Sequence, residues 1–319
     1  MTIVQNRNES RKGRLASRAG RPFIVAAALA GLLVWAPGAQ AADAEVIDAD
    51  ARFPEGPVWH DGKLYYVEYG GHTVMSWDGQ DSAVVWTLDG CGPAAVEPNG
   101  EGAFLVTCYD SNSLVKISSA GKTLQTYEKS ESGIALIGPN DITPDGKGGF
   151  YVTTSGPWET APIVGGVFHY GADGLIRQLA DDLHYANGVA LSPDGKTLYC
   201  SESYAGRIVQ FTVQDDGSLA DRREFVRLDR VMDDTTEEGL TPDGMEFDAE
   251  GNLYIGLYNR LGKILVVDAE GKFLRTLDVP SPYAPNLFFD PSGKFIYVTA
   301  VDDGDNAPYP GKVYKIGLD

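Results

Sequence analysis

Hydrophobic and polar positions along the chain follow one pattern that recurs six times. Each copy has a turn glycine followed by a short apolar strand rich in aromatic residues, at 62–68, 102–108, 149–155, 195–201, 251–257 and 293–299. The glycines of successive copies lie 40, 47, 46, 56 and 42 residues apart. A second short apolar segment follows each copy, and helical patterns are scarce. Short apolar strands separated by glycine turns predict an all-β protein.

The spacing of these copies predicts a β-propeller. A repeat of roughly 40 to 50 residues, with four short strands in each unit, is typical of propeller blades. Six copies therefore predict six blades. The last copy lacks an outermost strand, and we expect residues 44–50 to supply it and close the ring. A β-sandwich would also be all-β, but it gives no reason for one motif to recur six times.

Five of the six predicted inner strands begin with an acidic or amide side chain. These residues are Glu55, Asn140, Asn187, Asp243 and Asn286. The inner strands of a propeller line its central channel, so we expect these residues at one height around the axis. Oxygen donors that converge without sulfur or imidazole suit a hard cation, and Ca²⁺ fits best. The pattern predicts one Ca²⁺ at the channel mouth, bound by Glu55, Asn140, Asn187 and Asp243.

Other residues that could carry chemistry give weaker signals. The four histidines show no zinc-ligand spacing, and the chain has no G-x-S-x-G nucleophile motif and no phosphate-binding loop. His184 precedes Asn187 by three residues, in a loop that could overhang the channel mouth. Four aromatic residues lie on loops that leave the same side, namely Trp158, Tyr185, Tyr204 and Tyr258. We expect substrate contacts from Asn140, Asn286, Trp158, His184 and Tyr258, although ordinary loop packing would explain the aromatic residues equally well.

The first 41 residues differ from the repeats. They contain six basic residues and one acid, then an apolar run from Phe23 to Trp35 and the sequence Ala39-Gln40-Ala41. This order predicts a secretory signal peptide, and the run is shorter than the roughly 20 residues of a membrane span. We expect cleavage after Ala41, one propeller domain over residues 42–319, and a periplasmic or secreted location. An uncleaved membrane anchor is the alternative.

The net charge limits the classes of partner. The whole chain carries 26 basic and 45 acidic residues, a formal charge of −19, and residues 42–319 carry 20 and 44, a charge of −24. So acidic a surface would repel nucleic acid and anionic membranes. It is compatible with bound cations and with small substrates. We expect a small-molecule substrate, no nucleic-acid partner, no membrane contact after cleavage, and a monomer.

The three cysteines suggest one disulfide, because an exported protein can form such bonds. Cys91 and Cys108 flank a hairpin-like stretch in which they would face each other across the turn. A bond between them and two free thiols are both compatible with the sequence, and we predict the bond. Cys200 is then left over as a small buried apolar side chain.

The repeats resemble those of the SMP-30/gluconolactonase/LRE-like family of six-bladed propellers, which is related to the diisopropyl fluorophosphatases and paraoxonases. The stretches that carry the resemblance are "PEGPVW", "PNDIT…GGFYVTTSG", "ANGVALSPDGKTLY" and "PDGMEFDAEGNLYIG". The resemblance implies a catalytic divalent metal, usually Ca²⁺, bound by Glu55, Asn187 and Asp243, with Asn140 on metal or substrate. It also implies that Asp243 is the general base or nucleophile. Sugar-lactone members carry an Arg two residues before the Asn-Asp pair, where this chain has Gly138.

These expectations combine into a calcium-dependent hydrolase that opens a lactone ring. A metal ion would polarise the carbonyl group and stabilise the developing oxyanion, while Asp243 activates water or attacks directly. One alternative is a phosphotriesterase or arylesterase that uses the same metal site. Another is a non-catalytic periplasmic binding propeller in which Ca²⁺ only joins the blades.

Overall fold

The computed structural model of the protein describes residues 44–100, 102–232 and 239–318, which belong to one compact unit, Ala41–Asp319. The predicted signal peptide and its cleavage site lie outside the described residues. Within the described part, the regular structure is 24 β-strands and two short 3₁₀ helices, Ser203–Ala205 and Leu228–Arg230. No helix in these ranges is long and apolar enough to cross a membrane. The described part of the chain is therefore all-β, as predicted.

Sixteen of the strands form four separate antiparallel sheets, each of four strands in chain order. The first sheet contains β2 (Pro54–His60), β3 (Lys63–Glu68), β4 (Thr73–Trp77) and β5 (Ser82–Thr87). The second contains β6 (Pro93–Pro98), β7 (Ala103–Cys108), β8 (Ser113–Ser118) and β9 (Thr123–Tyr127). The third contains β10 (Pro139–Pro144), β11 (Phe150–Thr154), β12 (Gly165–Tyr170) and β13 (Ile176–Leu183). The fourth contains β14 (Ala186–Leu191), β15 (Thr197–Glu202), β16 (Arg207–Val213) and β17 (Leu219–Arg227).

The other eight strands form a single larger sheet. One part contains β18 (Pro242–Phe247), β19 (Leu253–Leu257), β20 (Lys263–Val267) and β21 (Phe273–Asp278). The other part contains β22 (Tyr283–Phe289), β23 (Phe295–Val301), β24 (Pro310–Gly317) and β1 (Ala44–Arg52), with β1 antiparallel to β24. The two parts join through one residue pair, Leu257 with Ala284. The fold is therefore propeller-like, with four separate blades and one larger sheet in place of the six separate sheets predicted.

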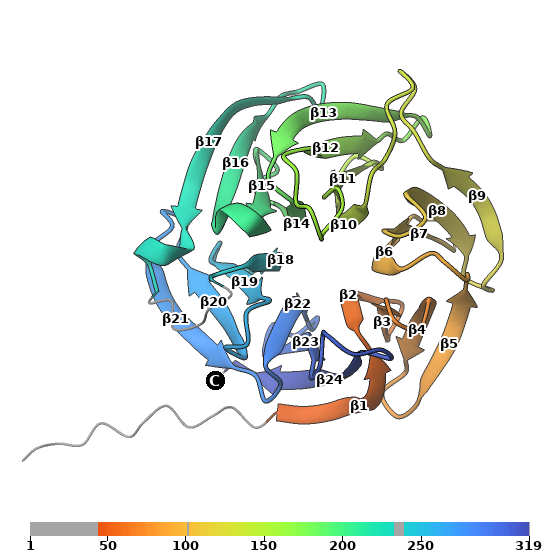
Figure 1. Ribbon diagram of the computed structural model, residues 1–319, viewed down its shortest axis with the longest axis vertical. Coiled ribbons are helices and arrows are strands. Elements are labelled where there is room, and N and C mark those ends of the chain that lie inside the picture. The colour runs from red at the N-terminus through yellow and green to blue at the C-terminus, as the bar shows by residue number, and fades with distance from the viewer. Residues whose placement is uncertain (1–43, 101, 233–238, 319) are drawn as a thin grey trace, which may run out of the picture. The chain divides into compact units, whose positions relative to one another are not determined.

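Six inner strands surround the central axis of this unit (Figure 1). Each of β2, β6, β10, β14, β18 and β22 contacts the next in this order, and β22 also contacts β2. The apolar side chains pack between neighbouring sheets, as Leu105 and Leu114 of one sheet do against Val152 and Phe168 of the next. Because the hydrophobic core lies between the sheets, the starts of the inner strands are left for polar residues.

All six inner strands share one irregularity close to their first residue. In β10, for example, Pro139 pairs with Thr154 but Ile142 pairs with Val152, so one extra residue stands on the inner strand. Such β-bulges bend a strand locally and redirect its side chains. The bulges therefore lie where the sequence predicts the metal ligands.

The disulfide between Cys91 and Cys108 is present, with the two Cα atoms 4.7 Å apart, so this pairing is confirmed. The register that predicted it is wrong, because β6 and β7 pair Pro93 with Cys108. Cys91 lies in the turn before β6, where its carbonyl oxygen accepts a hydrogen bond from the Asp110 N–H. Cys200 is free and fully buried, as predicted.

Candidate active site

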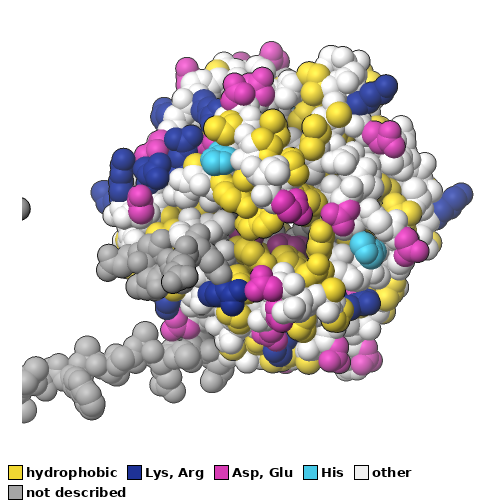
Figure 2. Space-filling view, viewed as in Figure 1, with side chains coloured by type: hydrophobic (Ala, Val, Ile, Leu, Met, Phe, Trp, Pro, Cys, Tyr) yellow, Lys and Arg dark blue, Asp and Glu magenta, His cyan; other side chains and the backbone are white. Residues whose placement is uncertain are grey.

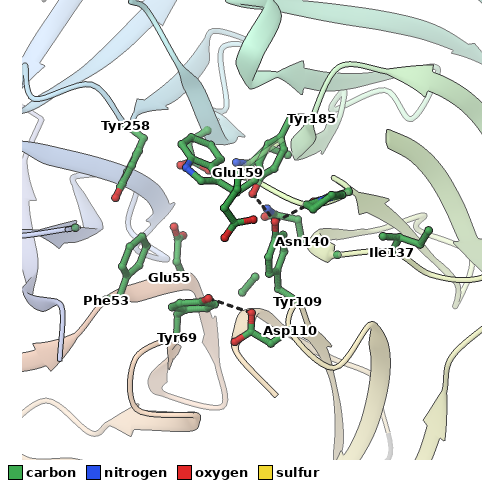
Figure 3. A pocket seen from close by; sticks show the side chains of 18 of the residues that line it. Phe53, Glu55, Tyr69, Tyr109, Asp110, Ile137, Asn140, Glu159, Tyr185 and Tyr258 are labelled. Carbon is green, nitrogen blue, oxygen red and sulfur yellow. Dashed lines mark hydrogen bonds between the residues drawn. The ribbon is translucent and has the colours of Figure 1, made fainter. Parts of the chain in front are cut away.

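A cavity of about 560 Å³ opens where the inner strands begin. Its lining includes Glu55 of β2, Asn140 of β10, Asn187 of β14 and Asp243 of β18. The four residues predicted to bind metal are thus brought together from four inner strands. Figure 3 shows the Glu55 and Asn140 side chains at this cavity. The second blade contributes Ala94, which has no ligand atom in its side chain.

Hydroxyl groups of neighbouring strands hold the two asparagines. The Thr153 hydroxyl donates to the backbone carbonyl of Asn187 at 2.6 Å, and the Thr107 hydroxyl donates to that of Asn140. The Asn140 side-chain nitrogen donates to Ser155 Oγ at 3.1 Å. Because this bond engages the amide nitrogen, the amide oxygen of Asn140 remains available to the cavity.

Burial and neighbouring negative charges disfavour ionisation of both predicted carboxylate ligands. Burial raises the pKa of Glu55, and the charges of Asp243 and Asp141 raise it further. Burial is also the main cause that raises the pKa of Asp243, with Asp141 as the second cause. Hydrogen bonds from Asn286 to Glu55 and from Asn187 to Asp243 oppose these shifts. Carboxylates whose ionisation is disfavoured by burial and by neighbouring negative charges form an arrangement that a nearby cation would relieve.

The donor set fits a hard divalent cation. In the part of the chain that the structure describes, no three side chains among His, Cys, Asp and Glu are grouped as a metal site. A metal ion here would therefore need amide oxygens in addition to the carboxylates of Glu55 and Asp243. Asn140 and Asn187 line the same cavity and can supply them. An all-oxygen set of carboxylates and amides, completed by water, is what Ca²⁺ prefers.

Asn286 lies one residue further along its strand than predicted. Its backbone carbonyl accepts a bond from the Thr299 hydroxyl, and its side-chain oxygen accepts one from the Leu287 N–H at 2.8 Å. Asp141, the residue after Asn140, makes the corresponding bonds with Thr153 and Ile142. Asn286 therefore occupies the strand position that corresponds to Asp141, one residue beyond the position of Asn140. The prediction that all five residues lie at one height around the axis is wrong for Asn286. It does not line the cavity and instead supports Glu55.

Sequence reasoning missed three acids on the inner strands, Asp141, Glu97 and Glu246, of which Asp141 is buried and the other two are partly buried. Asp141 accepts hydrogen bonds from the backbone N–H groups of Ile142 and Val189, both at 2.9 Å, and burial raises its pKa to about 7. Burial also raises the pKa of Glu97 on β6, and it raises that of Glu246 on β18 to about 7. Glu97 directly follows Val96 and Glu246 directly follows Met245 in short strands, so an acid at these two places was a detectable signal.

Seven aromatic residues line the cavity. The lining includes Tyr69, Tyr109, Tyr185, Tyr258 and Tyr309, together with Phe53 and Trp158. The Trp158 ring lies 4.9 Å from Tyr185 and 6.1 Å from Tyr258, at steep angles to both. The Tyr185 hydroxyl donates to the Tyr109 hydroxyl at 3.1 Å. Trp158 and Tyr258 thus lie where substrate contact was predicted.

His184 does not line the cavity. Its Nε2 atom lies 3.0 Å from the carbonyl oxygen of Ala161, and its ring stacks on Tyr204 with centroids 5.6 Å apart. Its backbone N–H donates to Glu202 at 2.8 Å. These contacts place His184 behind Tyr204 in a loop-packing role, and a contact with substrate stays a prediction.

The cavity lining is acidic. It contains Glu55, Asp110, Glu159 and Asp243, and among the described residues it contains no Lys, Arg or His. Figure 2 shows acidic side chains gathered around the central hollow. Gly138 adopts a positive φ of 62°, and a Cβ there would lie 2.9 Å from the Tyr109 ring. Tyr109 therefore leaves no room for a longer side chain at this position.

A protein-family model and several known proteins match most of this chain. The family model described as SMP-30/Gluconolactonase/LRE-like region matches residues 53–302. The pentonolactonase XacC of Haloferax volcanii is 25% identical over 273 residues, which cover 83% of this chain and 88% of that protein.

Two solved structures share the fold. One is a gluconolactonase from Xanthomonas campestris, with a TM-score of 0.70 and 21% identity, which covers 86% of this chain and 89% of that chain. The other is a calcium-binding protein, regucalcin, from Agrobacterium tumefaciens, with a TM-score of 0.69 and 18% identity, which covers 86% and 94%. At this level of identity the two structures speak for the fold alone.

Proposed function

This chain belongs to the SMP-30/gluconolactonase/LRE-like family, and on that basis we propose that it is a hydrolase that opens lactone rings. One observation carries the proposal: Glu55, Asn187 and Asp243 converge from separate inner strands on one cavity. The names of two similar proteins, a pentonolactonase and a gluconolactonase, support a lactone as the substrate.

The enzyme would use one divalent metal ion, and we propose Ca²⁺. Glu55, Asn140, Asn187 and Asp243 would bind it, because their oxygen atoms match the preference of this ion. The similar fold of a protein named as calcium-binding supports the choice. When bound, the ion would supply Lewis-acid polarisation of the lactone carbonyl group.

The chain's own residues would then perform the ring opening. The Asp243 carboxylate accepts a proton from a water molecule as its oxygen adds to the carbonyl carbon, or attacks that carbon itself. The hydrogen bond from Asn187 orients this carboxylate. When water adds, collapse of the tetrahedral adduct breaks the ring C–O bond, and the departing oxygen takes up the proton that Asp243 accepted, which gives a hydroxy acid. When Asp243 attacks directly, the same collapse leaves a mixed anhydride on Asp243, and a water molecule hydrolyses it to release the hydroxy acid and restore the carboxylate. The aromatic wall limits the access of bulk water during these steps.

Two further features belong to the same proposal. The eight-stranded sheet counts as two blades joined by the Leu257–Ala284 pair, so that the propeller has six blades and β1 closes the ring. Residues 1–41 act as a secretory signal, and residues 42–319 form the catalytic domain outside the cytoplasm, as a monomer.

Hydrolysis of a panel of γ- and δ-lactones, with and without a calcium chelator, tests the proposal. We expect turnover of at least one lactone, loss of activity with chelator, and recovery when Ca²⁺ is restored. The panel includes an aryl ester and a phosphotriester of similar size. Hydrolysis of these two compounds without any lactone turnover would overturn the assignment, and so would lactone turnover that persists after metal removal.

A further inference from the structure

Two of the four cavity acids have no role in the proposed chemistry. Glu55 and Asp243 are assigned to the metal ion, which would offset their charge. Asp110 and Glu159 remain, with no basic side chain among the described lining residues to neutralise them. Asp110 accepts a hydrogen bond from the Tyr69 hydroxyl at 3.0 Å, which partly satisfies its carboxylate. Glu159 is therefore the remaining acid that needs an explanation.

Glu159 extends into the cavity without a partner of its own. It follows Trp158 on the loop between β11 and β12, and Figure 3 shows its carboxylate directed into the space between Glu55 and Tyr109. The described residues supply it with no hydrogen bond and no ion pair. Its charge raises the pKa of Tyr109, for which burial is the larger cause. The side chain is exposed to solvent, and the direction of its carboxylate places a negative charge in the open part of the cavity.

Glu159 lines the cavity together with the rings of Tyr109, Trp158, Tyr185 and Tyr258. Trp158 meets Tyr185 at an interplanar angle of 79° and Tyr258 at 88°, so faces and edges of these rings form a corner. The faces of Trp and Tyr rings attract cations, and proteins bind quaternary ammonium groups in cages of such rings. A carboxylate beside the cage adds a direct Coulomb attraction that an uncharged group does not feel.

We propose that this site selects lactones whose substituent carries a positive charge, bound between Glu159 and the rings of Tyr109 and Trp158. The inference rests on the proposed lactonase function and names its substrate class. The lactone ring occupies the inner end of the cavity beside Asp243, and the cationic substituent lies at the outer end. Anionic lactones are disfavoured because Asp110 and Glu159 both repel them. A neutral hydroxylated lactone is the rival, since rings and carboxylates also bind sugar hydroxyls.

Three γ-butyrolactones that differ in one substituent separate these possibilities. The substituents are trimethylammonium, hydroxyl and carboxylate, which give a cationic, a neutral and an anionic lactone. At low salt we expect kcat/KM to fall in this order, by about tenfold or more between the cationic and the anionic compound, and the difference to shrink at 0.5 M salt. Equal or faster turnover of the hydroxyl compound would overturn the inference.

The variant Glu159→Gln assigns the effect to this residue. We expect the ratio of kcat/KM for the cationic over the neutral lactone to fall by about tenfold, since the side chain keeps its shape and loses its charge. Glu270→Gln is the matched control, because Glu270 is an exposed acid on the turn between β20 and β21 and does not line the cavity. Glu270→Gln changes the net charge of the protein by the same amount as Glu159→Gln, and it should leave the ratio of kcat/KM for the cationic over the neutral lactone unaltered. A ratio that is the same in Glu159→Gln and in the parent contradicts the proposal.

Binding of tetramethylammonium separates this inference from the proposed function. Calorimetric titration measures it without any turnover. Weaker binding to Glu159→Gln than to the parent and to Glu270→Gln supports the cation site, even if every lactone fails as a substrate and the hydrolase assignment falls. No binding, or equal binding to all three proteins, overturns the cation site even if neutral lactones are hydrolysed.

Discussion

The Thr153 hydroxyl donates a hydrogen bond of 2.6 Å to the backbone carbonyl of Asn187. Thr153 belongs to β11 and Asn187 to β14, so the bond joins neighbouring sheets at a residue of the candidate site. Thr107 on β7 makes the same bond to the carbonyl of Asn140 on β10. The blades thus fix the height of the predicted ligands through hydroxyl groups as well as through apolar packing.

Replacing Thr153 with valine should destabilise both the fold and the site. The variant Thr153→Val keeps the side-chain shape but leaves the Asn187 carbonyl and the Asp141 N–H, which donates to Thr153 Oγ1 at 3.0 Å, without their partner. Unpaired buried polar groups cost about 1–3 kcal/mol, so the free energy of unfolding should fall by that amount. Urea unfolding measures it, and a calcium titration should show weaker binding.

Thr153→Ser is the control, because it retains the hydroxyl and loses only a methyl group. It should cost less than Thr153→Val and should bind calcium more tightly than that variant. If the valine variant is as stable as the serine variant and binds calcium as well, the hydroxyl has no such role.

Asp243→Asn should separate chemistry from metal binding. The amide retains an oxygen ligand but removes a negative charge and the basic carboxylate, so lactone turnover should fall by orders of magnitude while the protein stays folded. Glu55→Gln should act through metal affinity instead, because a carboxylate binds Ca²⁺ more strongly than an amide. Lactonase rates and calcium titrations on both variants measure the difference.

Saturating calcium distinguishes the two outcomes. It should restore much of the activity of Glu55→Gln and little of that of Asp243→Asn. An Asp243→Asn protein that hydrolyses lactones at the parent rate would show that Asp243 has no chemical role. If neither substitution alters calcium binding, the metal lies elsewhere.

The disulfide should contribute measurably to stability. Cys91 and Cys108 are 17 residues apart, and closing a loop of that length in the unfolded chain is worth about 3 kcal/mol in the chain-entropy model. The double variant Cys91→Ser/Cys108→Ser should lose about that much stability, and the parent should fall to the same level in reductant. Thiol titration of denatured, unreduced parent should find Cys200 alone, and three reactive thiols would contradict the bond.

Repetition made the propeller-like, all-β fold predictable from the sequence, and it also indicated that four of the proposed ligands would line one cavity. Each copy places its turn glycine and inner strand alike, so Glu55, Asn140, Asn187 and Asp243 could be aligned by counting. Counting from the turn glycine gave the wrong strand position for Asn286. The Pro-Asn pair in β22 lies one residue further along its strand than the Pro-Asp pair of β18 that contains Asp243. A shared local motif does not fix the register when a strand begins earlier.

The rest of the cavity wall left no periodic signal. Phe53, Tyr69 and Tyr309 lie outside the regular strands, in connecting segments where neither the 2-residue nor the 3.6-residue period applies. Tyr109 follows directly after β7 and reads in the sequence as the end of a hairpin strand. Glu159 is one of many exposed acids in an acidic chain, and only its direction into the cavity distinguishes it.

Export should remove residues 1–41. The basic residues, the apolar run and the Ala39-Gln40-Ala41 sequence predict cleavage that leaves Ala42 as the first residue. Mass spectrometry of the protein recovered from outside the cytoplasm should give the mass of residues 42–319. A recovered product that retains residues 1–41 would refute the cleavage, and recovery in the cytoplasm would refute the export.

The stability of the protein should depend on pH through Glu246. Burial raises the pKa of Glu246 to about 7 from an ordinary value near 4.5, with Asp141 adding to the shift and the Phe247 N–H opposing it. The folded state therefore holds this proton more tightly than the unfolded chain. The stabilisation is complete below about pH 4.5 and is lost as the pH rises through about 7.

Glu246→Gln should remove that dependence, because a glutamine stays neutral and can still accept the hydrogen bond from the Phe247 N–H. With chelator present, urea unfolding should show the variant to be more stable than the parent by roughly 1–3 kcal/mol at pH 8.5, and the two should converge near pH 4.5. Glu250→Gln, an exposed acid on the turn between β18 and β19, should shift the stability little and equally at both pH values. If the curves of Glu246→Gln and the parent run parallel from pH 4.5 to 8.5, Glu246 ionises in the folded protein as it does in the unfolded chain.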